Sequence, residues 1–144
     1  MANARQVTIL MIEDDEGHAR LIERNIRRAG VLNDIVHKLD GTSAMAHLEA
    51  QAGRSGQPVL VLLDLNLPDM SGISILESIK ADPRLRRIPI IVLTTTDDAR
   101  EVQRCYDLGA NVYITKPVDY EQFASAIRQL GLFLSVIQVP GAEE

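Results

Sequence analysis

The chain has 144 residues and a mass of 15.9 kDa, with 46% hydrophobic and 24% charged residues, the size and balance of one globular domain. Its 20 acidic and 15 basic side chains leave a net charge of -5 and a pI near 5.2. The basic residues are scattered, and their densest group, Arg84, Arg86 and Arg87, is typical of a solvated connector. We therefore expect no nucleic-acid partner, because a phosphate backbone would be repelled.

The cysteine count and the apolar runs limit the class of protein further. Cys105 is the one cysteine, and the histidines at 18, 37 and 47 have no metal-ligand spacing around it, which predicts a reducing compartment and no zinc site. The apolar run 7–12 stops at Glu13, too early for a signal peptide or a membrane span. We expect a cytoplasmic protein with no membrane partner.

Strand-like and helix-like patterns alternate along the whole chain. Five short runs rich in Val and Ile predict strands at residues 7–12, 35–39, 59–63, 88–93 and 111–115. Apolar residues recur between them at helical spacing: Ala19, Ile22, Ile26 and Ala29, then Ala44 and Leu48, then Ile75 and Ile79, then Ala99, Val102 and Tyr106. Gly30 and Gly109 follow two of these patterns, where a residue of positive φ ends a helix. The repeats predict a doubly wound α/β fold with a five-stranded parallel sheet and five helices.

Polar side chains follow four of the five predicted strands. Glu13 and Asp14 come after the first strand, Asp64 after the third, Thr94 after the fourth and Lys116 after the fifth. The carboxyl ends of parallel strands meet at one edge of the sheet, where ligands bind. Three carboxylates at this edge raise at least one pKa unless a cation lies among them, and oxygen ligands suit Mg²⁺. The sequence therefore predicts a half-solvated magnesium site.

A strand-end carboxylate beside Mg²⁺ can attack phosphorus and form an aspartyl-phosphate. Lys116 and Thr94 supply the ammonium and the hydroxyl that position a phosphoryl group. The simpler interpretation is that Asp14 or Asp15 caps the first helix. Asp64 fits that interpretation poorly, because it follows the buried run VLVLL, where an unpaired charge is costly. The joint occurrence of these groups favours a phosphoryl site.

Motifs along most of the chain resemble the receiver domain of two-component response regulators. They are ILMIEDDE at 9–16, DG at 40–41, LLDLNLPDMSG at 62–72, IIVLTTT at 90–96, LGA at 108–110 and YITKP at 113–117. Their order and spacing match the family, which is more specific than any single motif. The resemblance implies the flavodoxin-like strand order 2-1-3-4-5.

The resemblance also implies a metal site. Asp64 would be the phosphoacceptor and would bind Mg²⁺ together with Asp14 and the main-chain carbonyl of Asn66, while Glu13 would act through water. The acidic pair is Glu-Asp where many family members have Asp-Asp. We expect metal binding to survive this difference.

The resemblance implies a switch driven by a partner sensor histidine kinase. After transfer of the phosphoryl group, Thr94 would move toward its oxygens, Tyr113 would turn into the space that Thr94 leaves, and Lys116 would contact the phosphoryl group. The protein would signal by switching protein interactions. It would not be an enzyme beyond magnesium-dependent self-phosphorylation and autodephosphorylation.

The residues after Pro117 predict one helix and a short tail. We expect 1–144 to be a single receiver domain without an output domain, with a core of about 6–134 and an extension at 135–144. One helical face carries Phe123, Ile127, Leu130, Leu134 and Ile137. A second apolar set lies elsewhere on this helix or its extension and predicts a symmetric homodimer, unless the tail covers its own core: Leu132, Phe133, Val136 and Val139.

With this apolar set, the ending LGLFLSVIQVP, the loop at 51–58 and the LTTTDD stretch make the chain most similar to the short stand-alone response regulators paired with bacterial phytochromes. This resemblance implies a light-sensing kinase upstream. Three alternatives stay open. A haloacid dehalogenase would need a second acid two residues after its nucleophile, and Asn66 stands there. The second alternative is a receiver-fold module that works without phosphorylation. The third is a phosphate sink or phosphorelay intermediate.

Overall fold

The computed structural model describes residues 7–52, 59–95, 98–116, 121–122 and 125. Strands and helices alternate in the order β1 (Thr8–Ile12), α1 (Glu16–Arg28), β2 (Ile35–Lys38), α2 (Gly41–Ala52), β3 (Val59–Asp64), α3 (Gly72–Ala81), β4 (Ile90–Thr94), α4 (Ala99–Asp107) and β5 (Val112–Thr115). The strands form one parallel sheet in the order β2-β1-β3-β4-β5. The predicted doubly wound fold is confirmed.

The fifth predicted helix falls mostly outside the described residues. Glu121, Gln122 and Ser125 are described and are helical. The four proposed interface residues, Leu132, Phe133, Val136 and Val139, lie outside the described part of the chain. Within that part, no helix combines the length and the apolar character needed to span a bilayer.

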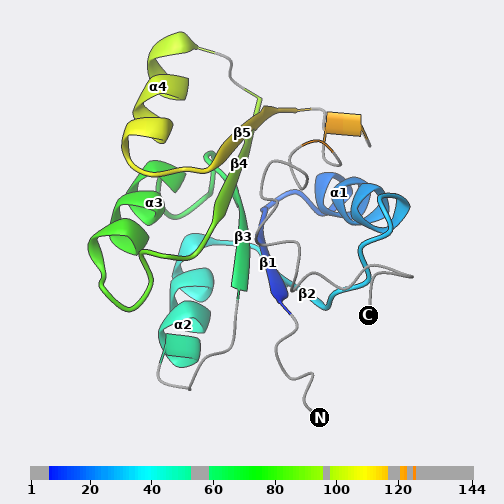
Figure 1. The fold of residues 1–144 in the computed structure, drawn as a ribbon, viewed down its shortest axis with the longest axis horizontal. Coiled ribbons are helices and arrows are strands. Elements are labelled where there is room, and N and C mark those ends of the chain that lie inside the picture. Colours follow the sequence, from blue (N-terminus) through cyan, green and yellow to red (C-terminus); the bar gives the residue numbers. More distant parts are fainter. Residues whose placement is uncertain (1–6, 53–58, 96–97, 117–120, 123–124, 126–144) are drawn as a thin grey trace.

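Helices cover both faces of the sheet (Figure 1). Helix α1 lies on one face, and α2, α3 and α4 lie on the other. The chain leaves β1 toward β2 on one side and returns over α2 to β3 on the other side of β1. The strand order therefore reverses between β1 and β3, the point where open α/β sheets bind their ligands.

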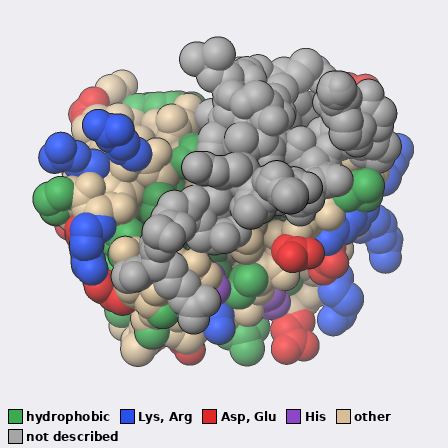
Figure 2. All heavy atoms as spheres, turned by 60° about the horizontal axis from the view of Figure 1, so that its bottom comes forward, with side chains coloured by type: hydrophobic (Ala, Val, Ile, Leu, Met, Phe, Trp, Pro, Cys, Tyr) green, Lys and Arg blue, Asp and Glu red, His purple; other side chains and the backbone are tan. Residues whose placement is uncertain are grey.

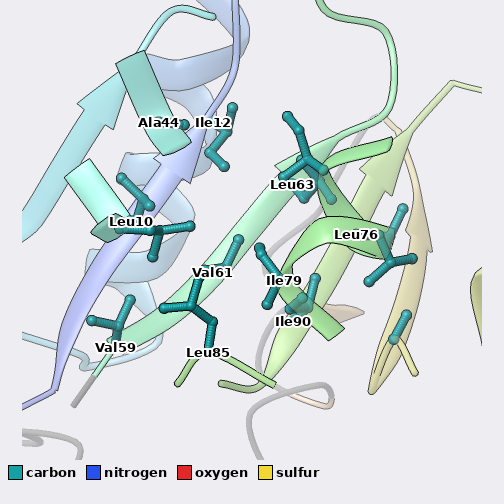
Figure 3. Packing of buried hydrophobic residues seen from close by; sticks show 14 of the residues in the cluster. Leu10, Ile12, Ala44, Val59, Val61, Leu63, Leu76, Ile79, Leu85 and Ile90 are labelled. Atoms are coloured by element: carbon teal, nitrogen blue, oxygen red, sulfur yellow. The ribbon is translucent and has the colours of Figure 1, made fainter. Parts of the chain in front are cut away.

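The core has two parts because side chains of a strand alternate between its faces. All six residues of β3 are buried. Leu60 and Leu62 pack on the α1 side, and Val61 and Leu63 pack with residues of α2 and α3 on the other side (Figure 3). A strand buried on both faces needs no polar alternation, which explains the continuous VLVLL run.

Local signals in the sequence fix most helix ends. Asp15 caps α1 by accepting a hydrogen bond from the His18 backbone N–H at 2.9 Å. Gly30 and Gly109 follow α1 and α4 with φ of 89° and 109°, the left-handed region that glycine adopts without strain. Both glycine predictions are confirmed.

The buried face of α4 differs from the predicted one. The spacing of Ala99, Val102 and Tyr106 predicted the core face, but Cys105 is the fully buried residue and Tyr106 is 44% exposed. Tyr106 instead uses its hydroxyl oxygen to accept a hydrogen bond from the Tyr113 backbone N–H at 3.1 Å. Tyrosine combines an apolar ring with a polar end, so its place in a helical stripe is a weak indication of burial.

The predicted strand at 88–93 is also displaced, because β4 spans Ile90–Thr94. Pro89 precedes the strand and has no N–H to donate to a neighbour. Its carbonyl still accepts a hydrogen bond from the Val61 N–H at 3.0 Å. Thr94 therefore belongs to the strand itself, as does Asp64 at the end of β3.

Candidate functional site

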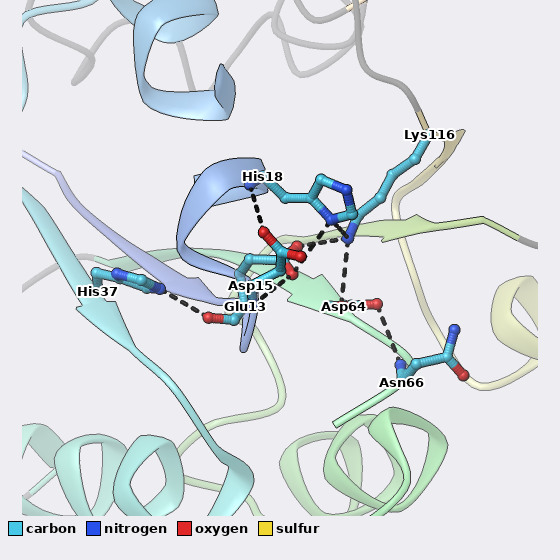
Figure 4. A network of polar contacts seen from close by, with 7 residues as sticks. All are labelled: Glu13, Asp15, His18, His37, Asp64, Asn66 and Lys116. Atoms are coloured by element: carbon cyan, nitrogen blue, oxygen red, sulfur yellow. Dashed lines mark hydrogen bonds and ion pairs between the residues drawn. The ribbon is translucent and has the colours of Figure 1, made fainter. Parts of the chain in front are cut away.

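The sheet brings strand-end residues together at its carboxyl edge. Glu13 follows β1 and Asp64 ends β3, and the pairing of Ile12 with Leu63 places these two acids on adjacent strands at the same level. Lys116 follows β5, and its ammonium lies 2.5 Å from Glu13 Oε1 and 3.3 Å from Asp64 Oδ2 (Figure 4). The three residues form a charged triad whose side chains are almost wholly buried.

Asp14 completes a cluster of three carboxylates. One oxygen each from Glu13, Asp14 and Asp64 lies within 4.8 Å of the others. Glu13 is 1% exposed and Asp64 is 4% exposed, whereas Asp14 is open to solvent. Burial is the largest cause of a raised pKa at Glu13; the Lys116 hydrogen bond opposes it, and the charge of Asp64 adds to it. The direction agrees with the predicted rise, but burial is its main cause and repulsion by Asp64 a smaller one.

Backbone groups fix the orientation of the buried acids (Figure 4). The Asp15 N–H donates to Glu13 Oε2 and the Asn66 N–H donates to Asp64 Oδ1, both at 3.1 Å. A ring nitrogen of His37 contacts the Glu13 carbonyl oxygen at 2.7 Å. Because Asp15 caps α1, Asp14 is left at the cluster, which resolves the two interpretations of these neighbouring acids.

The other predicted residues lie close to this cluster along the chain or the sheet. Thr94 is fully buried at the end of β4, and its carbonyl accepts a hydrogen bond from the Lys116 N–H at 2.6 Å. Asn66 follows Asp64 by two residues and has an exposed side chain. Tyr113 is partly buried against the α3 side of the core. The roles expected for these residues stay predictions.

His18 is a neighbour of the site that its position in the sequence did not reveal. Its side chain is 48% exposed. Its Nδ1 nevertheless lies 3.3 Å from Lys116 Nζ and 3.8 Å from Glu13 Oε2. The signal was its place in the first turn of α1, directly after the acidic pair.

Gly72 sets the approach of α3 to the phosphoacceptor candidate. A Cβ atom on Gly72 would lie 2.6 Å from both the Asp64 carbonyl oxygen and the Leu65 Cα. The Gly72 N–H donates to the Leu65 carbonyl at 2.9 Å, and Asn66 pairs with Ser71 in an isolated bridge. The loop between β3 and α3 is therefore closed at its base, and only glycine fits there.

The donor set of the cluster suits a hard divalent cation. Three carboxylates face one lysine, so a cluster with every acid ionised has an excess of negative charge at a largely buried place. Carboxylate oxygens are the ligands that Mg²⁺ and Mn²⁺ accept, and the exposed Asp14 leaves one side open to water or phosphate. The residues present fit such a metal.

An open parallel α/β sheet with this acidic cluster, a buried aspartate and a lysine at its carboxyl edge defines a class of metal-binding, phosphoryl-accepting domains. The family model for the response regulator receiver domain matches residues 9–128. The chain belongs to this family, whose members act in two-component signalling and are phosphorylated on an aspartate. The match favours the receiver over the haloacid dehalogenase alternative.

Known proteins similar to this chain include several response regulators, one of them a bacteriophytochrome response regulator. Response regulator Rcp1 of Synechocystis sp. is 34% identical over 93% of both chains. Its solved Mn²⁺-bound form has a TM-score of 0.72 at 33% identity, covering 94% of this chain and 99% of Rcp1. The bacteriophytochrome response regulator RtBRR has a TM-score of 0.82 at 33% identity, covering 95% of this chain and 85% of its own. A receiver domain from Rhodospirillum rubrum is 67% identical, with a TM-score of 0.75 and coverage of 96% and 100%.

Proposed function

We propose that Asp64 accepts a phosphoryl group from a phosphorylated histidine of a sensor kinase. The bond between phosphorus and the imidazole nitrogen breaks, a bond from phosphorus to a carboxylate oxygen of Asp64 forms, and the electron pair stays with the imidazole. The observation that supports this role is the environment of Asp64. It is a buried carboxylate at a strand end, with one oxygen on the Lys116 ammonium and the other on the Asn66 N–H.

Mg²⁺ is the proposed metal. Asp14, Asp64 and the carbonyl of Asn66 would hold it, and Glu13 would act through a water molecule. The ion neutralises charge on the phosphoryl oxygens when it is bound. Lys116, which follows β5, supplies a second positive charge and keeps Asp64 oriented in the unphosphorylated protein. Together these groups allow self-phosphorylation and autodephosphorylation without activity on a separate substrate.

Thr94 and Tyr113 are the proposed switch residues. The Thr94 carbonyl accepts a hydrogen bond from the Lys116 N–H, so a movement of the Thr94 backbone would also move Lys116. The Tyr113 backbone is in turn bonded to Tyr106 of α4. Phosphorylation would favour one of two arrangements of these elements through contacts that exist in that arrangement alone.

The partner proposed for the site is a sensor histidine kinase of the bacteriophytochrome type, because of the likeness to the bacteriophytochrome response regulator RtBRR. A cytoplasmic location agrees with an unpaired, buried Cys105. On the described face in Figure 2, Lys and Arg side chains lie on both flanks with Asp and Glu among them, which favours protein partners over nucleic acid. We also propose a homodimer through Leu132, Phe133, Val136 and Val139, supported by their apolar pattern.

Intact mass spectrometry after incubation with acetyl phosphate tests this function. We expect wild type to gain one phosphoryl group only when Mg²⁺ is present, and Asp64→Asn to gain none. Asp34→Asn, a change at an exposed aspartate away from the cluster, is the matched control and should behave like wild type. A gain that persists in Asp64→Asn would refute Asp64 as the acceptor. Wild type that gains nothing from acetyl phosphate or from a phosphorylated kinase would favour the phosphorylation-independent module.

A further inference from the structure

The loop between β3 and α3 is bonded at its far end to another helix. Asp69, in this loop, accepts hydrogen bonds from the Gly41 N–H at 2.8 Å, the Thr42 N–H at 2.8 Å and the Thr42 hydroxyl at 2.5 Å. Gly41 and Thr42 form the first turn of α2, where backbone N–H groups have no partner within the helix. We call these three bonds the Asp69 link.

Close packing accompanies the Asp69 link. A Cβ atom on Gly41 would lie 2.5 Å from Met70 Cγ and 3.0 Å from Ile75 Cδ1. Met70, which follows Asp69 in the loop, therefore already fills the space beside the Gly41 backbone. The first turn of α2 and the end of the loop lie against each other both through hydrogen bonds and through an apolar contact.

The near end of the same loop carries groups of the phosphoryl site. The Asn66 N–H orients Asp64, and Asn66 also pairs with Ser71 across the base of the loop. Asp69 lies between these two paired residues in the chain. A loop closed at its base and bonded at Asp69 has little freedom to move its first residues, the ones beside Asp64.

We infer that Asp69 is a positioning residue for the metal and phosphoryl site, which it serves by fixing the β3–α3 loop to the first turn of α2. This inference rests on the proposed metal binding by Asp14, Asp64 and the Asn66 carbonyl. Asp69 touches neither metal nor phosphate; it determines where Asn66 lies.

Helix capping alone does not account for Asp69. Asp40, the residue directly before α2, already caps this helix, because its Oδ1 accepts a hydrogen bond from the Ser43 N–H at 2.8 Å. The Asp69 link instead joins residues 27 and 28 positions apart. Its hydrogen bonds to Thr42 and Gly41 lower the pKa of Asp69 to about 2, so the carboxylate stays charged at neutral pH.

This difference between the two aspartates provides a matched test. Asp69→Ala removes the link, whereas Asp40→Ala removes a cap of the same helix and leaves the link in place. Each metal-free full-length protein is titrated with MgCl₂ by isothermal calorimetry, since the chain has no tryptophan to report binding by fluorescence. We expect Asp69→Ala to weaken Mg²⁺ binding about tenfold, the usual loss when a partner behind metal ligands is removed. Asp40→Ala should bind like wild type.

Thr42→Val keeps the positioning test decisive if Asp69→Ala fails to fold. It removes only the hydroxyl donor of the Asp69 link, at a residue of α2 outside the site. Weaker Mg²⁺ binding by a variant with a wild-type far-ultraviolet circular dichroism spectrum supports the inference. Equal affinity in wild type and the foldable link variant overturns it, as does an equal loss in Asp40→Ala. Wild type that binds no Mg²⁺ refutes the proposed function itself, which is a distinct result.

Discussion

Gly72→Ala should disturb the phosphoacceptor through backbone contact alone. The added Cβ would lie 2.6 Å from the Asp64 carbonyl oxygen and from Leu65 Cα, about 1 Å closer than carbon atoms normally approach. Neither neighbour can turn away as a flexible side chain does, because both are main-chain atoms. Either helix α3 or the end of β3 must therefore shift.

The expected magnitude follows from two opposing effects. Overpacking of this kind costs about 1–3 kcal/mol, and alanine in a helix recovers about 0.5–1 kcal/mol relative to glycine. We therefore expect a net loss of up to about 2.5 kcal/mol, or up to roughly 10 °C in melting temperature for a domain of this size. A displacement of Asp64 approaching 1 Å would slow phosphoryl transfer by up to about 100-fold.

Thermal unfolding and the rate of phosphorylation by acetyl phosphate measure the two effects. Gly17→Ala is the matched control, because Gly17 lies in the exposed first turn of α1 and the nearest atom to an added Cβ would be a carboxylate oxygen of the exposed Asp15, at 3.2 Å. The control should melt close to the wild-type temperature. Wild-type stability together with a wild-type rate in Gly72→Ala would refute the argument from close approach.

Three further predictions concern charge and association. Lys116→Met leaves the buried Glu13 without its cation, so the metal-free protein should lose about 3 kcal/mol in urea unfolding, and saturating Mg²⁺ should recover part of that loss; unchanged stability without metal would contradict the ion pairs. The pKa of Asp69 is lowered from 3.8 to about 2, so its stabilising effect is present above pH 4 and is lost as the pH falls toward 2. Between pH 4 and pH 2, the melting temperature of Asp69→Ala should therefore fall less with decreasing pH than that of wild type. Charged residues at Phe133 and Val136 should give a folded monomer by analytical ultracentrifugation; a dimer unaffected by both changes would place the interface elsewhere.

Apolar runs and strand-end polar groups were enough to predict the sheet and most of its site. β3 illustrates the reason, since a run that is apolar at every position has few alternatives to a central parallel strand. The cluster of Glu13, Asp14 and Asp64 followed because parallel strands place their carboxyl ends at one edge. The choice between Asp14 and Asp15 as a cap required the structure, since neighbouring acids give the same signal.

The contacts that the sequence did not indicate are polar and long-range. His18 meets Lys116 across 98 positions, and Asp69 meets Gly41 across 28. Hydrophobic periodicity determines which face of an element is buried, but it carries no information about which polar side chains meet beyond the core. The exposed Tyr106 shows a related limit, because an amphipathic side chain takes part in an apolar pattern while its hydroxyl finds a partner on β5.

The site is complete only when four neighbouring strands of the sheet are paired. Glu13, Asp64, Thr94 and Lys116 come from β1, β3, β4 and β5, which are consecutive neighbours in the sheet. A chain in which any one of these strands is undocked lacks part of the site, so we expect such a chain not to accept a phosphoryl group. Ligands that bind the complete site stabilise the docked state by mass action. Opening of β5 at the sheet edge, measured by amide exchange, should therefore become rarer as the site is filled.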